Sequence, residues 1–279
     1  MLARCSSARI ALNRPHARLA PPRNPGLATH AAYQDAALPS SPLSGTKVLV
    51  AGATGGVGRQ VVEVLVQAGV PCRALVRDLD KARSSLPMSS GLVELVRGDV
   101  FQFASLPGAL GDAGCVVCAT GASGLADPLG PFNVDYQGTA NLVAAAKQQG
   151  VKKFVLVTSI GADDLINPLN LFYGVLFWKK RGEEVLQRSG LDYTIIRPGG
   201  LKNQLRAGEV AGNVVARGPG FYGVPPRGQA GSILRRQVAE VCVAALSEPA
   251  AANKVVEVIA TPDAPALTYA QLFASVGVN

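Results

Sequence analysis

The stretch LVAGATGGVGR (49–59) holds the residues that most clearly could do chemistry. Its glycines Gly52, Gly55 and Gly58 recur every third residue, directly after the apolar run KVLVAG. At a strand-to-helix turn, such glycines permit a tight bend, close approach of backbone N–H groups to a pyrophosphate, and close packing of helix on strand. The following helix points its positive end at that anion. The turn predicts a dinucleotide site, with a purely structural turn as the alternative, and the residues expected to line it are Gly52, Thr54, Gly55, Gly56, Val57, Gly58 and Arg59.

The end of the second predicted strand (72–77) bears on the choice between NAD and NADP. Chains that bind NAD place an acid about 20 residues beyond the glycines, where it accepts a hydrogen bond from the ribose 2′-hydroxyl. Here Arg77 ends the strand and Asp78 follows. A guanidinium binds a 2′-phosphate bidentately, and Arg59 could add a second positive charge. We therefore predict that NADP(H) is preferred over NAD(H). In the alternative, Arg77 is a solvated charge and Asp78 is the ribose acid.

Residues after two further predicted strands complete the adenosine side of this site. Asp99 and Val100 follow the third strand (93–98), where a carboxylate would accept from the exocyclic amine of adenine and Val100 would contact the ring. Ala119, Thr120 and Gly121 end the fourth strand (115–120), and their small size lets a cofactor pass over the sheet.

Histidine and cysteine usage narrows the remaining chemistry. Both histidines, His16 and His30, lie within residues 1–34, so a chain that loses this leader has none. His-dependent nucleophilic triads and His-based metal sites are then excluded. Cys115 and Cys118 form a C-x-x-C inside a strand candidate, where residues three apart point to opposite faces of a sheet. We interpret both as core cysteines and predict no metal site.

The pattern of apolar segments predicts the elements that position these residues. Short apolar runs predict seven strands, at 47–52, 72–77, 93–98, 115–120, 153–159, 193–199 and 254–260. Segments with helical periodicity lie between them, near 57–69, 101–111, 134–149, 172–189, 235–247 and 268–276. Alternating strands and helices, with strands apolar on both faces, predict an α/β fold of Rossmann type: a doubly wound parallel sheet of about seven strands. The Gly- and Pro-rich segment near 200–234 breaks the alternation and is expected to form a small C-terminal cap on the substrate side.

The first 34 residues differ in composition from the rest of the chain. They contain five arginines and no acid, are rich in Ala, Ser and Pro, and lack an apolar core segment. This composition predicts an organelle transit peptide (1–34), followed by a linker (35–45) and the domain (46–279), with a basic tail that binds nucleic acid as the alternative. The domain shows no basic run with interleaved aromatic residues, so we predict no nucleic-acid partner. No run approaches the ~20 apolar residues of a membrane span, so we predict no transmembrane segment.

Several motifs together resemble a known superfamily. In chain order they are GATGGVG, LVRD, GDV, NVDYQGTANLV, KFVLVTSIGA, DYTIIRPGGLKN and ILRRQVAEVCVAAL, and they span 47–276. They are similar to the atypical short-chain dehydrogenases/reductases, in the NAD(P)-binding, NmrA-like and flavin-reductase-like branch. The segments RPGGLKN and PALTYAQLFASV are most similar to a plastid group of plants and algae. The resemblance implies a chloroplast location, in the stroma or at the thylakoid or plastoglobule.

The resemblance also implies where catalysis would occur. Members that transfer hydride use a serine and a Tyr-x-x-x-Lys pair, in which the tyrosine donates a proton and the lysine holds the nicotinamide ribose. Ser159 matches the serine, but Phe177 and Arg181 stand at the tyrosine and lysine positions, and neither can serve there. Tyr173, expected one helical turn before Phe177, and Lys179 are the candidate substitutes.

The candidate catalytic and nicotinamide-side residues each have a second interpretation. Tyr173 could be a packed aromatic residue, and Lys179 could be a solvated charge rather than a contact to the nicotinamide ribose. In RPGG, Pro198 and Gly199 are expected beside the nicotinamide, whereas Arg197 is expected to be structural.

Two functions therefore stay open. The first is an NADPH-dependent reductase of a flavin, quinone or similar small acceptor, in which the cofactor does the chemistry and the protein supplies geometry. The second is a non-catalytic NADPH-binding scaffold, assembly factor or redox sensor at the thylakoid or plastoglobule. Eight of the ten residues in LNLFYGVLFW (169–178) are hydrophobic and three basic residues follow. This pattern slightly favours a pocket wall covered by the segment near 200–234, with peripheral contact to an anionic membrane or a partner as the alternative.

Overall fold

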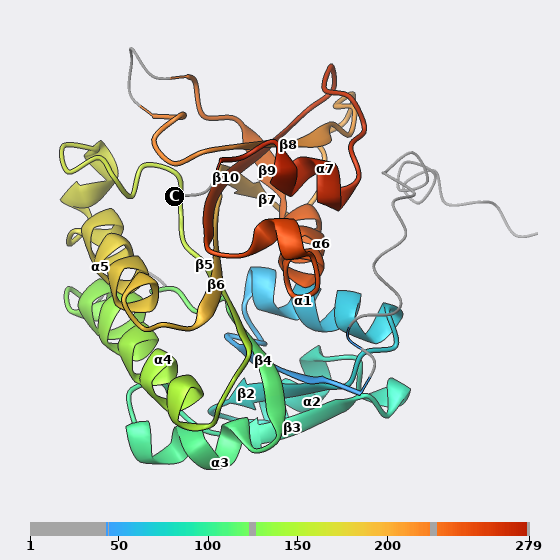
Figure 1. The fold of residues 1–279 in the computed structure, drawn as a ribbon, viewed down its shortest axis with the longest axis vertical. Helices are drawn as coiled ribbons and strands as arrows, with labels where there is room; N and C mark the ends of the chain where they lie inside the picture. Colours follow the sequence, from blue (N-terminus) through green and yellow to red (C-terminus); the bar gives the residue numbers. More distant parts are fainter. Residues whose placement is uncertain (1–42, 44, 123–126, 224–227, 278–279) are drawn as a thin grey trace, which may run out of the picture. The chain divides into compact units, whose positions relative to one another are not determined.

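A computed structural model describes residues 43, 45–122, 127–223 and 228–277 (Figure 1). All of them belong to one unit of the chain, 33–279. The predicted transit peptide (1–34) and most of the predicted linker (35–45) lie outside the described residues.

An eight-stranded sheet forms the centre of this unit. Its strands, in spatial order, are β3 (Val93–Arg97), β2 (Cys72–Val76), β1 (Lys47–Ala51), β4 (Ala113–Cys118), β5 (Lys153–Val157), β6 (Asp192–Pro198), β10 (Lys254–Thr261) and β8 (Asn213–Arg217). All neighbouring strands are parallel except β8, which pairs antiparallel with β10. The seven predicted strands are present, and the predicted Rossmann-type α/β fold is confirmed. The order of strands reverses between β1 and β4, so ligands are expected at the carboxyl ends of these two strands.

Helices cover both faces of the sheet (Figure 1). On one face, buried side chains of α1 (Gly56–Gln67), α6 (Arg235–Ala245) and α7 (Tyr269–Ala274) form a core with the sheet. On the other face, α3 (Leu106–Leu110), α4 (Thr139–Gln148) and α5 (Val175–Gln187) form a second core. The shorter elements are α2 (Leu79–Ser85), the π-helical η4 (Pro131–Gly138), and the 3₁₀ turns η2 (Met88–Ser90), η3 (Phe103–Ser105), η5 (Pro168–Leu171) and η6 (Pro249–Ala251).

The two cysteines of the C-x-x-C motif lie in different cores. Cys115 packs with the α1–α6 side and Cys118 with the α3–α4 side, as expected for residues three apart on a strand. Both are buried and free, and burial raises the pKa of Cys115 to about 11. Their interpretation as core residues is confirmed.

The segment near 200–234 contains more regular structure than its composition predicts. Strands β7 (Gly200–Lys202) and β9 (Ser232–Leu234) pair in parallel as a separate small sheet, and β8 adds the eighth strand to the large one. The structure thus contains a strand of the main sheet that the sequence pattern does not predict. The role of this segment as a substrate-side cap stays a prediction.

Candidate functional site

The glycine turn between β1 and α1 is shaped by contacts that exclude side chains. Gly52 has φ +76°, and a Cβ there would lie 2.6 Å from the carbonyl oxygen of Ala119, at the end of β4. A Cβ on Gly58 would collide with the carbonyl oxygen of Gly52. These two glycines bring α1 against β1, and the turn against β4, as the predicted motif requires.

The remaining residues of the turn are open to a ligand. Thr54, Gly55 and Gly56 are exposed, whereas Val57 is buried against the core. Helix α1 begins at Gly56 with no side-chain cap and no acidic residue in its first turn. Its N-terminal N–H groups therefore face outward at the switch point of the sheet, which is the arrangement that binds a pyrophosphate. The residues present fit a dinucleotide.

Charged residues predicted to contact the adenosine half lie at the ends of neighbouring elements. Arg77 is exposed, and no carboxylate of the described residues pairs with it. Asp78 caps α2: its Oδ1 accepts hydrogen bonds from the backbone N–H groups of Asp80 and Lys81, both at 3.1 Å. Arg59 is half-exposed and lies 3.9 Å from Glu63 on the same helix. The charge of Arg59 is thus partly balanced, whereas that of Arg77 is not.

After β3, Asp99 and Val100 form a short ordered turn. The Asp99 Oδ1 accepts from the Phe101 N–H at 3.0 Å, and the Val100 carbonyl accepts from the Asn141 amide at 2.8 Å. Asp99 is half-buried and Val100 is buried. Ala119 and Thr120 follow β4 and meet the glycine turn through Gly52, so the two sets of predicted residues lie together.

Lys179 belongs to α5, and a buried acid holds its side chain beside Gly121, which follows β4. Its Nζ donates to Oδ1 of Asp135 at 2.7 Å, and the side chain of Asp135 is only 2% exposed. The same Nζ lies 3.7 Å from the position that a Cβ on Gly121 would take. Lys179 is 15% exposed, so it is not a solvated charge. Sequence reasoning missed Asp135, although the motif NVDYQG contains it.

The two other catalytic candidates are placed differently from each other. Ser159 is half-buried, two residues after β5, and its Oγ donates to the Ile160 carbonyl at 3.1 Å. Tyr173 was expected on the helix, one turn before Phe177, and this expectation is wrong. Tyr173 has φ +56° and precedes Gly174, which caps α5, so the helix begins only at Val175.

An Asn side chain explains this late start. Oδ1 of Asn170 accepts from the backbone N–H groups of Leu176 and Phe177, both at 3.0 Å, and so satisfies donors of the first helical turn. Phe177 is 38% exposed, and Arg181, at the family's lysine position, pairs with Glu184 at 2.6 Å.

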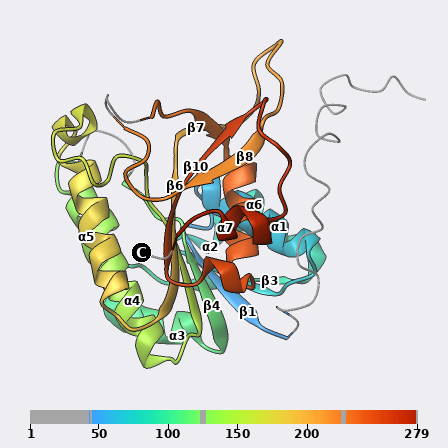
Figure 2. The same cartoon turned by 45° about the horizontal axis from the view of Figure 1, so that its top comes forward.

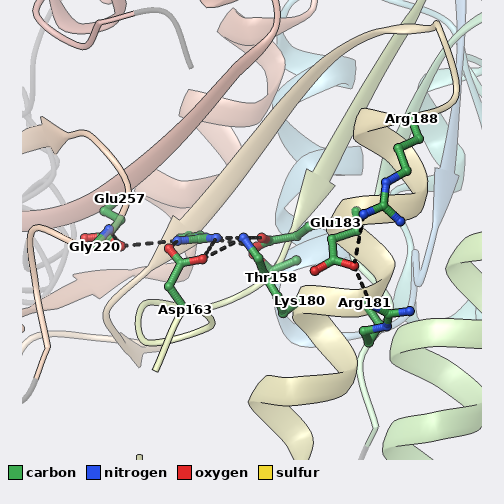
Figure 3. Close-up of polar contacts among 10 residues, drawn as sticks. Thr158, Asp163, Lys180, Arg181, Glu183, Arg188, Gly220 and Glu257 are labelled. Atoms are coloured by element: carbon green, nitrogen blue, oxygen red, sulfur yellow. Dashed lines mark hydrogen bonds and ion pairs between the residues drawn. The ribbon is translucent and has the colours of Figure 1, made fainter. Parts of the chain in front are cut away.

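Arg197 lies at the centre of an ionic cluster with Asp163, Glu183 and Glu257, which are labelled in Figure 3. It is fully buried and donates to Glu183 from Nε at 2.9 Å and from Nη2 at 2.6 Å, and to Asp163 from Nη2 at 3.1 Å. Thr158 also donates to Glu183, at 2.6 Å, and Lys180 pairs with Asp163 at 2.6 Å. Burial alone would raise the pKa of Asp163, but hydrogen bonds from Arg197 and Lys180 lower it to about 2. The expected structural role of Arg197 is confirmed.

The cluster extends into the segment near 200–234. Glu257 of β10 lies 3.5 Å from Arg197 and accepts from the backbone N–H groups of Gly220 at 2.7 Å and Tyr222 at 2.9 Å. One network therefore joins the loop after β5, helix α5, strands β6 and β10, and residues 220–222. The acids of this network escaped sequence reasoning, because nothing in their spacing links them.

The RPGG turn lies where β6 ends. Pro198 is buried and Gly199 is half-buried. A Cβ on Gly199 would collide with the carbonyl oxygen of Gly231, just before β9. Since β1, β4 and β6 are parallel, their carboxyl ends share one edge of the sheet, and this edge gathers the glycine turn, Gly121 with Lys179, and the RPGG turn.

Comparisons with known proteins agree with this geometry. A family model described as NAD(P)H-binding matches residues 52–249. An uncharacterised chloroplastic protein of Arabidopsis thaliana is 43% identical over 241 residues, which are 82% of this chain and 82% of that protein. Chloroplastic protein TIC 62 of Oryza sativa subsp. japonica is 38% identical over 268 residues, which are 87% of this chain and 52% of TIC 62. This chain thus matches only about half of TIC 62.

A solved structure has a fold similar to that of this chain. ChuY, an anaerobilin reductase of Escherichia coli O157:H7, has a TM-score of 0.62 and 25% identity, over 79% of this chain and 100% of ChuY. The resemblance inferred from the sequence motifs is confirmed. With the glycine turn, the sheet order and these similarities together, the chain belongs to the NAD(P)H-binding family of atypical short-chain dehydrogenases/reductases.

Proposed function

We propose that this protein binds NADPH and serves as a reductase of a small conjugated acceptor, such as a flavin or a quinone. The observation that carries the proposal is Lys179, which Asp135 fixes beside Gly121 where the nicotinamide half of the cofactor is expected. Bound NADPH supplies a hydride. The chain supplies position: the glycine turn holds the phosphates, Lys179 orients the ribose, and Pro198 and Gly199 lie on the nicotinamide side.

The absence of a tyrosine at position 177 limits the acceptors that this protein could reduce. Phe177 stands at the family's tyrosine position and cannot donate a proton. A flavin or quinone takes up hydride with little acid catalysis, because its ring system delocalises the added charge. Ser159 matches the family's serine and is half-buried after β5, and we propose that it contacts the acceptor. Tyr173 stays a second candidate, on the loop before α5.

We propose further that NADPH is preferred over NADH. Arg77 is exposed with no described carboxylate partner, so its guanidinium is available for a 2′-phosphate. The alternative, in which Asp78 binds the ribose 2′-hydroxyl, is less favoured, since Oδ1 of Asp78 already caps α2.

A non-catalytic NADPH-binding scaffold, assembly factor or redox sensor is the second candidate function. Two observations favour it: the Tyr-x-x-x-Lys pair is replaced by Phe177 and Arg181, and exposed apolar side chains gather before α5 and in its first turn. These side chains, hereafter the apolar loop surface, are Leu165, Ile166, Leu169, Leu171, Phe172, Tyr173 and Phe177.

We also propose a chloroplast location with peripheral contact to a membrane. The chloroplastic relatives support the compartment. The exposed side chains of the apolar loop surface support contact with a lipid surface, at the thylakoid or the plastoglobule. Within the described residues, no helix combines the length and apolarity needed to cross a bilayer.

The reductase proposal is tested by NADPH oxidation with flavins, quinones and carbonyl compounds as acceptors. Oxidation with a flavin or quinone supports it, whereas NADPH binding without oxidation of any acceptor supports the scaffold. The double variant Asp135→Asn/Lys179→Met removes the lysine without leaving a buried carboxylate unpaired, and we expect turnover at least about tenfold lower. Lys147→Met, an exposed lysine at the end of α4, is the matched control and should keep the wild-type rate.

A further inference from the structure

The small sheet near the substrate side brings two polar residues together. In the parallel pairing of β7 with β9, Lys202 lies opposite Leu234, and Asn203 and Arg235 directly follow these two strands. Nη1 of Arg235 donates to Oδ1 of Asn203 at 2.8 Å. Arg235 is also the first residue of α6, which packs beside α1 (Figure 2). The hydrogen bond to Asn203 therefore holds the Arg235 side chain in one direction.

That direction is toward the glycine turn. Nε of Arg235 lies 2.6 Å, and its Cδ 2.9 Å, from the position that a Cβ on Gly56 would take. Any side chain at this position would displace the guanidinium. The glycine at 56, which the dinucleotide motif itself does not require, thus makes room for Arg235 at the N-terminal end of α1.

Positive charge accumulates here without a counter-charge. Helices α1 and α6 both begin at this point, and neither has an acidic residue in its first turn. No carboxylate in the described part of the chain pairs with Arg235, whose one side-chain partner there is the amide oxygen of Asn203. Two helix N-terminal ends and a guanidinium repel one another unless an anion lies between them.

We propose that Arg235, oriented by Asn203, binds the pyrophosphate of the dinucleotide beside Gly56, at the N-terminal end of α1. This inference rests on the proposed cofactor binding. A guanidinium suits this task because it donates two parallel hydrogen bonds to phosphate oxygens. Since Arg235 and Asn203 belong to the segments that end β9 and β7, the cofactor bridges these segments to α1. Asn203 is a positioning residue, and Arg235 touches the ligand.

The test distinguishes binding of the pyrophosphate by Arg235 from binding of the 2′-phosphate. The affinities of wild type and Arg235→Ala are measured by calorimetry for NADPH, NADH, ADP-ribose and 2′-AMP. We expect Arg235→Ala to bind NADPH, NADH and ADP-ribose at least about tenfold more weakly, with the NADPH/NADH ratio unchanged. Affinity for 2′-AMP, which lacks a pyrophosphate, should stay within about twofold and so also reports that the variant is folded. Asn203→Ala should lose about threefold toward ADP-ribose, because the arginine is no longer oriented.

Arg236→Ala is the matched control, since it removes an arginine one residue further along the same helix. Arg236 pairs with Glu240 at 2.7 Å and contacts Gln67, away from Gly56. We expect Arg236→Ala to bind each of the four ligands with wild-type affinity. Unchanged ADP-ribose affinity in Arg235→Ala overturns the proposal, and so does an equal loss for ADP-ribose and 2′-AMP, which indicates a general effect on the fold. A wild-type protein that binds none of the nicotinamide cofactors overturns instead the proposed function.

Discussion

At the scale of single residues, Arg77 decides in our proposal which cofactor this protein prefers. Replacing it with Ala removes a charge-assisted contact to the 2′-phosphate, worth about 1.5–3 kcal/mol, and tenfold in affinity needs only about 1.4 kcal/mol. We expect Arg77→Ala to bind NADPH at least about tenfold more weakly and NADH unchanged, as measured by calorimetric titration. An unchanged ratio of the two affinities would contradict the assignment and favour Asp78 as the ribose ligand.

A second prediction at this scale concerns Gly58, in helix α1. Alanine forms helices better than glycine, but we expect Gly58→Ala to destabilise the folded protein. A Cβ there collides with the Gly52 carbonyl, which belongs to rigid backbone. Forcing a methyl group into such a contact typically costs about 1–3 kcal/mol. Gly58→Ala should lower the free energy of unfolding by about this amount in urea denaturation. Gly108→Ala in α3 is the control: nothing lies within 4 Å of its Cβ position, so it should be neutral or stabilising.

Sequence reasoning found the glycine turn and Lys179 but not their partners, for a physical reason. The role of a glycine in a βα turn depends on local backbone geometry, which the motif itself specifies. Asp135 and Arg235 act across 44 and 179 positions of the chain, on Lys179 and Gly56 respectively. Only the packing of α5 on η4 and of α6 on α1 brings these pairs together.

At the scale of elements, the ionic cluster around Arg197 predicts a specific response to acid. The pKa of Asp163 is lowered from 3.8 to about 2 in the folded protein. A depressed folded pKa stabilises the protein above the unfolded value, and this contribution is lost as the pH falls from about 4 through about 2. We expect the free energy of unfolding of the wild type to fall more steeply across this window than that of Asp163→Asn. Parallel acid titrations of both proteins, followed by circular dichroism, measure the difference, and identical slopes would contradict it.

The elements that sequence analysis did not predict are those whose apolar residues do not recur at helical or strand spacing. Helix α2 (LDKARSS) buries only Ala82, so it shows no stripe, although Asp78 is a recognisable helix cap. Strand β8 (NVVAR) lies at the sheet edge and within a Gly- and Pro-rich segment, which hides its alternation. The seven parallel strands were predictable, because burial on both faces makes them continuous apolar runs.

At the scale of the whole molecule, we expect the apolar loop surface to bind the protein to lipid membranes. Leu171 is 85% exposed and Phe177 is 38% exposed, whereas Trp178 packs against Phe132 and Tyr136. We expect the chain without residues 1–34 to co-sediment with anionic liposomes, and Leu171→Ser/Phe177→Ser to stay in the supernatant. Val210→Ser, which changes an exposed apolar residue between β7 and β8, is the control and should co-sediment. A wild-type protein found only in the supernatant would indicate that this surface meets a protein or a substrate instead.

The reactivity of the buried cysteines reports how often the core of this domain becomes exposed to solvent. Cys72, Cys115, Cys118 and Cys242 are all buried, and burial raises the pKa of Cys72 and of Cys242 to about 12. Only a thiolate attacks an alkylating reagent, so these thiols react when the sheet and its helices separate and not before. In a Cys5→Ser variant, the alkylation rate at each site therefore measures how often that part of the core is exposed to solvent. Because the four thiols are divided between the two faces of the sheet, ligands that hold α1 against α6 should slow Cys72 and Cys242 more than Cys118.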